Sequence, residues 1–536
     1  MQDAYPLQVL VSLGLAVLGL TLLARAVRVA PPIALLFGGV LLGFVPWLTD
    51  VQLPPSVVLL LFLPALLYWE SLNTSLREIR ANLRAVMIDA VLLVLATAGV
   101  VAVVGHALGL SWPVAWVLGA VVAPTDATAV AAIARRMPRR QLTQLRAESL
   151  VNDGTALALF AIAVEVASGS EFGLVGAVGQ FVLSYVGGVL AGLAVAWLAG
   201  RARRYLHDPL LENTVGVLTP FTAFLVAEEI HASGVLAVVV CGLAMSQLGP
   251  LLIAAHTRQR ARAFWTVSTF LLNGALFVLV GLQLRRAIAN LVSSSLTEAV
   301  IAALLVSAAV IGTRLGWMYT VPYLVRWVDR RAVHQARRLS ARHRFPVAWS
   351  GFRGGVSLAA ALAVPTVTSD GSPLPGRDLL IVVTFGVILV TLLLHGLTLP
   401  AVLRWSRLPD DHDEITERWE AERAAVEAGL EALDEAIARI QPSDRVADRV
   451  RDDLEQRLAD LDDPTTAPED NGFEGSAEGR SDRETYRRLR AELLPRERAA
   501  VVKLRDAHVI DDIVLRWMEG RLDAEELRLL PPPEPE

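Results

Sequence analysis

The segment Glu148-Ser-Leu-Val-Asn-Asp153 places two carboxylates inside an otherwise apolar run at about 143–166. A helix of about twenty apolar residues crosses roughly 30 Å of hydrocarbon, so this run predicts a membrane-spanning helix. An ionisable side chain at membrane depth costs roughly 3 kcal/mol or more unless it is paired or hydrated. The two acids therefore indicate a function that is carried out inside the membrane.

The polar residues of this segment lie on adjacent faces of the predicted helix. Ser149 and Asp153 are four residues apart and share one face, while Glu148 and Asn152 share the neighbouring face. Together they offer oxygen atoms, which a hard cation such as Na+ prefers. They also offer a carboxylate that can take a proton in place of the cation. The segment therefore predicts a site for a cation or a proton.

Comparable apolar runs fill most of the chain, which has 536 residues, 54% of them hydrophobic. A soluble protein of this size rarely has that composition. We therefore expect an all-α polytopic membrane protein with thirteen transmembrane helices. The thirteen runs lie at about 7–27, 31–48, 54–70, 83–105, 113–134, 143–166, 174–199, 212–230, 233–250, 260–284, 296–325, 345–366 and 378–404.

Basic residues in the loops alternate with these runs. The loops that follow runs 1, 3, 5, 7, 9 and 11 hold 23 basic residues, whereas the opposite side holds three, Arg285, Arg286 and Arg377. Loops rich in arginine and lysine stay in the cytoplasm. The alternation supports the count of thirteen, and it predicts a cell-membrane protein with its N-terminus outside and its C-terminus in the cytoplasm.

Charge divides the chain into two predicted domains. Residues 1–407 carry 30 basic and 18 acidic residues, a net charge of +12, and residues 408–536 carry 19 and 36, a net charge of −17. The first part is the predicted transmembrane domain and the second a cytoplasmic tail. Apolar residues at steps of three and four predict a helix over 412–440 in the tail. A second helical stretch is expected at 484–528, with a disordered segment at about 464–483 between them.

Two of the apolar runs contain residues that interrupt helices. Pro124 removes a backbone hydrogen bond in the fifth run, and Gly351, Gly354 and Gly355 surround Arg353 in the twelfth. Broken helices at membrane depth line cavities and are typical of transporter binding sites. The two runs lie seven apart and so run in opposite directions. We therefore expect spans 1–6 and 8–13 to form two inverted repeats.

Other ionisable residues in the runs allow more than one interpretation. Glu70 ends the third run and is either a site residue or merely interfacial. Asp126 follows Pro124 and is either a ligand or the cap of the second half of a broken helix. We expect Glu148 and Arg353 to form a structural ion pair. Arg314 in run 11 is either a counter-charge near the site or a packing residue with its own neutralising partner.

A set of motifs occurs in order along the apolar runs: Phe62-Leu-Pro64 with Glu70, Pro124-Thr-Asp126, Glu148-Ser-Leu-Val-Asn-Asp153-Gly, Phe270-Leu-Leu-Asn273 through Gly281-Leu-Gln283, and Gly351-Phe-Arg353-Gly-Gly. Together these motifs resemble the monovalent cation/proton antiporter family, in its Na+/H+ exchanger (NhaP-like) branch. The resemblance covers essentially the whole membrane part. One difference is that the third run reads Pro64-Ala65, where many relatives have two prolines.

The resemblance implies a six-helix core domain, a dimerisation domain and a homodimer whose core moves like an elevator. It implies that Na+ is held by Asp153, Asp126, Ser149, Glu70 and the backbone at Thr125. An Asn-Asp pair, here Asn152-Asp153, goes with electroneutral exchange in the wider family. Alternating access then follows if the core moves only when cation or proton neutralises the carboxylate.

Two alternatives remain open from the sequence. One is K+/H+ exchange, because the motifs do not separate Na+ from K+ or Li+. The other is a cation channel, which usually needs a ring of ligands from several subunits. No phosphate loop, metal cluster or nucleophile motif occurs in the sequence. We therefore expect no enzymatic activity, no cofactor and no nucleic-acid partner, with Na+, H+ and the lipid bilayer as the partners.

Overall fold

The protein is described here by a computed structural model. It describes residues 5–45, 58–134, 137–169, 173–206, 208–328, 340–408, 412–462 and 477–529. Within these ranges every regular element is helical, and the one extended pairing is a bridge between Val367 and Pro373. The all-α architecture expected from the sequence is confirmed for this part of the chain.

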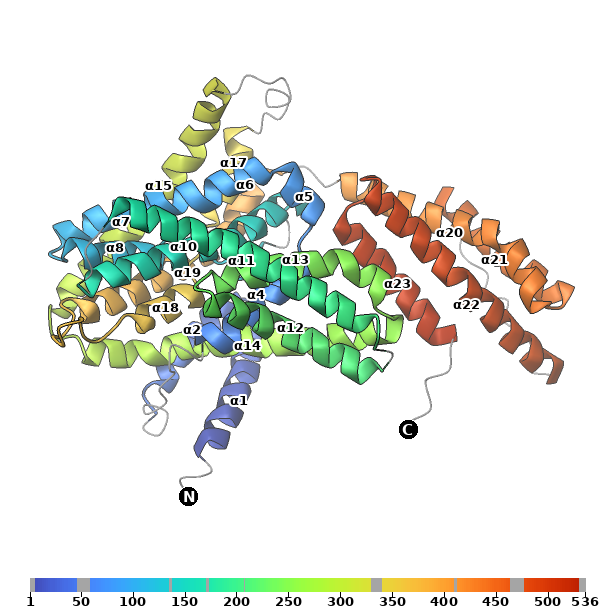
Figure 1. The fold of residues 1–536 in the computed structure, drawn as a ribbon, viewed down its shortest axis with the longest axis horizontal. Helices are drawn as coiled ribbons and strands as arrows, with labels where there is room; N and C mark the ends of the chain where they lie inside the picture. Colours follow the sequence, from blue (N-terminus) through green and yellow to red (C-terminus); the bar gives the residue numbers. More distant parts are fainter. Residues whose placement is uncertain are drawn as a thin grey trace.

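The apolar part of the chain folds into consecutive helices (Figure 1). Two short π-helical segments, η2 and η3, interrupt it. The helices are α1 (Tyr5–Ala26), α2 (Pro31–Leu42), η2 (Val58–Phe62), α4 (Leu63–Leu72), α5 (Leu76–Ala81), α6 (Leu83–Met87), η3 (Ile88–Leu93), α7 (Val94–Ala107), α8 (Trp112–Val122), α9 (Ala127–Ile133), α10 (Arg139–Ala167), α11 (Leu174–Arg203), α12 (Pro209–Glu229), α13 (Gly234–Leu252), α14 (Ala255–Ala289), α15 (Leu296–Val328), α17 (Ala341–Trp349), α18 (Gly355–Ala363) and α19 (Arg377–Ser406).

These helices coincide with the predicted apolar runs. Among the described residues, nine helical stretches are long and apolar enough to cross a membrane, and three shorter apolar helices accompany them at Pro31–Leu42, Leu60–Leu72 and Gly234–Pro250. The pair α17–α18 occupies the twelfth run. Residues 46–57, at the junction of the second and third runs, lie outside the described ranges. The number of membrane crossings stays a prediction.

The membrane helices pack in two groups. The group that we call the crossing bundle contains α7, α8, α9, α10, α15, α17, α18 and α19, which pack mainly on one another. The second group, the flanking bundle, contains α1, α2, α4, α11, α12, α13 and α14. The crossing bundle holds both interrupted helices. The two groups meet where α10 packs on α13 and where α14 packs on α18 and α19.

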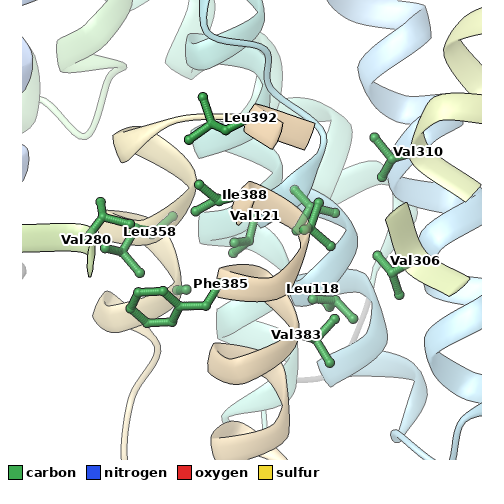
Figure 2. Close-up of a cluster of buried hydrophobic side chains, with 14 of the residues drawn as sticks. Leu118, Val121, Val280, Val306, Val310, Leu358, Val383, Phe385, Ile388 and Leu392 are labelled. Carbon is green, nitrogen blue, oxygen red and sulfur yellow. The ribbon is translucent and has the colours of Figure 1, made fainter. Parts of the chain in front are cut away.

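Tightly packed aliphatic side chains fill the crossing bundle. Figure 2 shows Leu118 and Val121 of α8 beside Val383 and Ile388 of α19, all fully buried. Lipid chains are as apolar as these side chains, so close packing rather than water exclusion holds such helices together. Gly119 permits this closeness, because a Cβ there would lie 2.3 Å from the carbonyl oxygen of the α7 residue Ala98.

Both interruptions expected from the sequence are confirmed. Helix α8 ends at Val122 and α9 begins at Ala127, so the chain is unwound around Pro124. In the same way α17 ends at Trp349 and α18 begins at Gly355, and the residues between them have no regular structure. Each interruption leaves helix-terminal N–H and C=O groups without intrahelical partners in the interior of the bundle.

The C-terminal tail forms a separate four-helix unit beside the membrane helices, at the right of Figure 1. It contains α20 (His412–Ile440), α21 (Asp444–Asp462), α22 (Ala477–Asp506) and α23 (Asp512–Leu529). The predicted helix at 412–440 is confirmed. Two buried apolar clusters join the four helices, one around Leu433 and Leu493 and the other around Val514 and Met518.

Two predictions for the tail were wrong in part. Of the segment expected to be disordered, residues 464–476 lie outside the described ranges, but residues 477–483 begin α22. The single stretch expected at 484–528 is two helices, because the chain turns between Asp506 and Asp512. Helix α21 was not predicted. It is highly charged, yet Val446, Val450 and Leu454 recur every fourth residue and are buried.

Candidate functional site

The two unwound segments cross each other. The backbone N–H of Asp126 donates a hydrogen bond to the carbonyl oxygen of Phe352 across a distance of 2.9 Å. The close approach of the two segments requires glycine in the second one, since a Cβ on Gly354 would lie 2.0 Å from Asp126 Oδ2. The glycines around Arg353 thus give Asp126 room beside the second interruption.

Asp126 caps the helix that follows it. Its Oδ1 accepts hydrogen bonds from the backbone N–H groups of Thr128, at 2.8 Å, and Ala129, at 3.3 Å. These are two of the donors that a helix start leaves unsatisfied. The same oxygen accepts from the Thr128 hydroxyl. The capping role considered from the sequence is therefore present, and it leaves Oδ2 available on the side of Gly354.

Arg353 caps the opposite end of the first interruption. Its Nε donates to the carbonyl oxygen of Val122 at 2.9 Å, and its second terminal nitrogen donates to Ala123 at 3.3 Å. It also donates to the carbonyl oxygen of Gly351 in its own unwound segment. A cation suits this place, because the C-terminal end of a helix carries partial negative charge. The guanidinium thus joins the two unwound segments.

The predicted ion pair between Glu148 and Arg353 was wrong. Glu148 pairs with Arg314 of α15, whose two terminal nitrogens reach the two carboxylate oxygens, the longer contact being 3.2 Å. Both side chains are almost fully buried. The physical reason is that Arg353 donates its hydrogen bonds to the free carbonyl groups at the end of α8. The buried guanidinium of Arg314 in the same bundle pairs with Glu148 instead. Arg314 is thus a structural partner of Glu148.

Side chains of α10 hold the first unwound segment in place. The Ser149 hydroxyl donates to the Thr125 carbonyl oxygen at 2.7 Å and accepts from the Ala127 N–H at 3.2 Å. Asn152 Nδ2 donates to the Thr125 hydroxyl at 2.8 Å. These three hydrogen bonds replace those that Pro124 and the missing helical turn remove.

A cavity of about 50 Å³ lies beside the crossing. Asp153, Asp126, Ser149, Thr125 and Glu70 all line it, so the structure brings together five of the predicted site residues. Asn152 does not line it. The walls come from both bundles. The remaining lining residues are Phe62, Leu63, Leu66, Leu67, Pro124, Thr128, Asn273, Leu276, Gly354, Gly355, Val356 and Ser357.

Asp153 has the least compensated charge in this cavity. The residue is 5% exposed, and none of the described residues donates a hydrogen bond to its carboxylate. A buried carboxylate without donors is costly when ionised, so it must be neutralised by a proton or by a cation. No three His, Cys, Asp or Glu side chains gather closely enough to hold a metal ion in the described ranges. A cation at Asp153 therefore needs neutral oxygen ligands as well.

A second, larger cavity of about 540 Å³ adjoins the first, and we call it the tail-side vestibule. Leu66, Glu70, Thr128 and Asn273 line both cavities. The tail-side vestibule is also lined by Ile513, Arg516 and Trp517 of the tail helix α23. No sequence pattern predicted that the tail would reach this place, since an apolar face does not specify which surface it covers.

Comparison with known proteins identifies the family. The family described as "Sodium/hydrogen exchanger, transmembrane" matches residues 13–405. The chain belongs to the sodium/hydrogen exchanger family. Members of this family are multi-pass membrane transporters that exchange cations for protons, and they are not enzymes. The match covers all the helices of both bundles except the first eight residues of α1 and the last residue of α19.

Individual exchangers are similar over most of their length. An uncharacterized Na+/H+ exchanger of Mycobacterium tuberculosis strain H37Rv is 44% identical over 99% of this chain and 98% of its own. The Na+/H+ antiporter ApNhaP of Aphanothece halophytica is 30% identical over 81% of this chain and 80% of its own. The solved sodium proton antiporter MjNhaP1 of Methanocaldococcus jannaschii matches in fold, with a TM-score of 0.59 at 18% identity, over 75% of this chain and all of its own.

Proposed function

We propose that this exchanger carries Na+ in one direction and H+ in the other through competition at Asp153, with Asp126 as the partner ligand. The observation that carries the proposal is the buried Asp153 carboxylate, which faces a cavity and receives no hydrogen bond from the described residues. Asp126 Oδ2, Ser149, Glu70 and Thr125 line the same cavity. They supply the further oxygen atoms that a bound Na+ requires.

Obligatory exchange follows from electrostatics. A negative Asp153 in a small, mostly apolar cavity is strongly disfavoured unless something neutralises it. Either Na+ or H+ does so, and each excludes the other. If the crossing bundle moves only in the neutral state, one cation is exchanged for one proton. Such a movement supports alternating access, because the cavity lies between the two bundles. It would expose Asp153 to one side of the membrane and then to the other.

Electroneutral exchange is the stoichiometry that the site favours. Asn152 beside Asp153 adds no second titratable charge, and its amide holds the Thr125 hydroxyl. In this proposal Asp126 caps α9 through Oδ1 and keeps the same charge throughout the cycle, so that one proton replaces one cation at Asp153. Exchange rates in proteoliposomes should therefore stay unchanged when a membrane potential is imposed. A steep response to the potential would contradict the 1:1 ratio.

The wider architecture follows from the same proposal. We propose thirteen membrane crossings in two inverted repeats, with the crossing bundle as transport domain and the flanking bundle as the dimerisation surface of a homodimer. The N-terminus lies outside the cell and the tail lies in the cytoplasm. The tail binds Arg77, Arg139 and Arg258, which follow predicted spans 3, 5 and 9. These are loops that the arginine distribution places on the cytoplasmic side.

Cation identity has one competing possibility. Relatives in Bacillus subtilis and Bacillus pumilus, 30% and 29% identical, are named sodium, potassium, lithium and rubidium/H+ antiporters. K+ exchange is therefore the second candidate. Na+ stays the first candidate, because the relatives of Mycobacterium tuberculosis and Aphanothece halophytica described above are named Na+/H+ exchanger and Na+/H+ antiporter.

The decisive experiment measures proton efflux from proteoliposomes driven by Na+, K+ or Li+ in turn. Wild-type protein should respond most strongly to Na+. Asp153→Asn keeps the shape of the side chain and removes its charge, so it should abolish exchange and leave a folded protein. Glu212→Gln is the matched control, since Glu212 is buried on α12 and does not line the cavity. Substantial Na+-driven efflux by Asp153→Asn would refute the competition mechanism.

A further inference from the structure

Ser357 is a buried hydroxyl that faces the same cavity without a partner. It lies in the first turn of α18, is 1% exposed, and lines the cavity together with Asp126 and Asp153. Its Oγ has no hydrogen-bond partner in the described part of the chain. Leaving a buried hydroxyl unsatisfied destabilises a fold, so its position calls for a ligand that is not part of the chain.

The hydroxyl groups of other buried residues on these helices are satisfied in a common way. Ser307 and Thr391 each donate to the carbonyl oxygen four residues earlier, at 2.6 and 2.8 Å. Ser357 does not do this. The residue four earlier is Arg353, which lies in the unwound segment, so its carbonyl is not positioned by the helix. The interruption thus leaves the Ser357 hydroxyl available.

Ser149 lines the same cavity but has less hydrogen-bonding capacity left than Ser357. A hydroxyl has one donor and two acceptor positions. Ser149 uses its donor on Thr125 and one acceptor position on Ala127, so one position remains. Asp126 likewise uses Oδ1 to cap α9. Ser357 keeps its whole capacity, so both acceptor positions of its hydroxyl oxygen are open to a cation.

We propose that Ser357 is a further Na+ ligand and supplies a neutral oxygen from the second interrupted helix. The proposal rests on the function proposed above. A cation bound to Asp153 of α10, Asp126 of the first interruption and Ser357 of α18 would join all three elements. Binding would then stiffen the crossing of the two unwound segments, which couples occupation of the site to the state of the bundle. This function differs from that of Ser149, which chiefly positions the first interruption.

The test uses Ser357→Ala in the full-length protein, with Ser307→Ala as matched control. Ser307 is buried in the same bundle, but its hydroxyl is bonded to the backbone and does not line the cavity. We expect Ser357→Ala to raise the apparent Km for Na+ by about tenfold, because one ligand is lost, while the maximal rate at saturating Na+ stays within about twofold. Ser307→Ala should leave both values unchanged.

A second measurement does not depend on transport. A ligand that binds only the folded state stabilises it, so Na+ should raise the thermal stability of the protein in detergent. Ser357→Ala should shift the Na+ concentration needed for this stabilisation upward by the same factor. If Ser357→Ala fails to fold, Ser357→Cys keeps the volume and places a soft sulfur where a hard cation prefers oxygen, so it should show the same shift.

The outcomes separate the two proposals. Wild-type protein without Na+-driven proton efflux would refute the proposed function, and the stabilisation by Na+ would still report on Ser357. Active wild-type protein together with an unchanged Km and an unchanged stabilisation in Ser357→Ala would refute the assignment of Ser357 alone.

Discussion

Two buried acids of α10, Glu148 and Asp153, have opposite surroundings. Glu148 lies against the guanidinium of Arg314 and is neutralised permanently. Asp153 faces a cavity and has no hydrogen-bond donor among the described residues. A pair that is already neutral gives a bundle stability but no exchangeable site, whereas an uncompensated carboxylate is available to whatever cation arrives. The sequence predicted a structural ion pair for Glu148 and a ligand role for Asp153, but with Arg353 in place of Arg314 as the partner of Glu148.

Removing one member of the Glu148–Arg314 pair should strongly lower the stability of the fold. Arg314→Ala leaves a buried carboxylate unpaired, and we expect a loss of about 3–5 kcal/mol in stability. Replacing both members with Gln and Met should restore much of that loss, since two neutral groups of similar volume need no compensation. Thermal unfolding in detergent measures both changes. A double variant as unstable as Arg314→Ala would show that packing, rather than charge pairing, determines the effect.

Asp126 caps α9 and is also the proposed partner ligand of the cation, and substitutions can separate these two roles. Asp126→Asn keeps an oxygen that can cap α9, because Asn is as good an N-cap as Asp, but it removes the negative charge. We expect wild-type stability and a large rise in the apparent Km for Na+. Asp126→Ala loses the cap as well and should cost about 1 kcal/mol more in stability than Asn. Equal unfolding temperatures for the two variants would contradict the capping role.

The interrupted helices are the element that the sequence predicts best. Pro124 removes a backbone hydrogen bond, and the glycines around Arg353 are poor helix formers, so the positions of both breaks could be inferred. The partner of Glu148 could not, because Arg314 and Arg353 are separated from it by more than 160 residues and nothing local chooses between them. Helix α21 was not predicted for a related reason: its apolar residues are few, and their role becomes clear only from their packing against α20 and α22.

Arg353 should act through geometry as much as through charge. Its planar group donates to two carbonyls of the first unwound segment and one of the second. Lys has a single ammonium and cannot reproduce this fork. We expect Arg353→Lys to lower stability measurably, and Arg353→Gln to lower it further because the positive charge at the end of α8 is also lost. Unfolding temperatures in detergent test the order. Lys at wild-type stability would contradict the geometric role.

At the scale of the whole molecule, an acidic tail is bound to the basic end of the membrane part. Asp512 Oδ2 accepts from the first two amides of α5, those of Leu76 and Arg77, at 2.9 and 3.2 Å. Arg258 of α14 pairs with Asp523 of α23. A carboxylate at a helix N-terminus is stabilising, so Asp512 of the tail acts as a cap for α5. The tail is therefore part of the folded exchanger.

Acidification should strengthen this docking through Glu519 of α23. Burial raises the pKa of its carboxyl above the ordinary 4.5 and Asp523 adds to the shift, while Arg258, Arg498 and Arg262 oppose it. A raised pKa in the folded state gives stability that is present at low pH and lost as the pH rises through that pKa. Glu519→Gln should therefore be more stable than wild type at pH 8, with a smaller difference at pH 5. Thermal unfolding at the two pH values measures this, and a difference that grows on acidification would contradict it.

The tail also shapes the electrostatics of the tail-side vestibule, which adjoins the candidate site. Arg516 of α23 lines the tail-side vestibule with Arg146 and Arg262, against one acid, Glu70. Three guanidinium groups lower the local concentration of cations in such a space. Arg516→Gln should therefore lower the apparent Km for Na+ supplied from the tail side by about two- to threefold, with a smaller effect at high ionic strength. Arg528→Gln, at the far end of the same helix and outside the tail-side vestibule, is the matched control. Proteoliposomes of defined orientation separate the two sides. An equal effect of both variants on the apparent Km would contradict a role for the position of Arg516. It would mean that the overall charge of the tail determines the apparent Km.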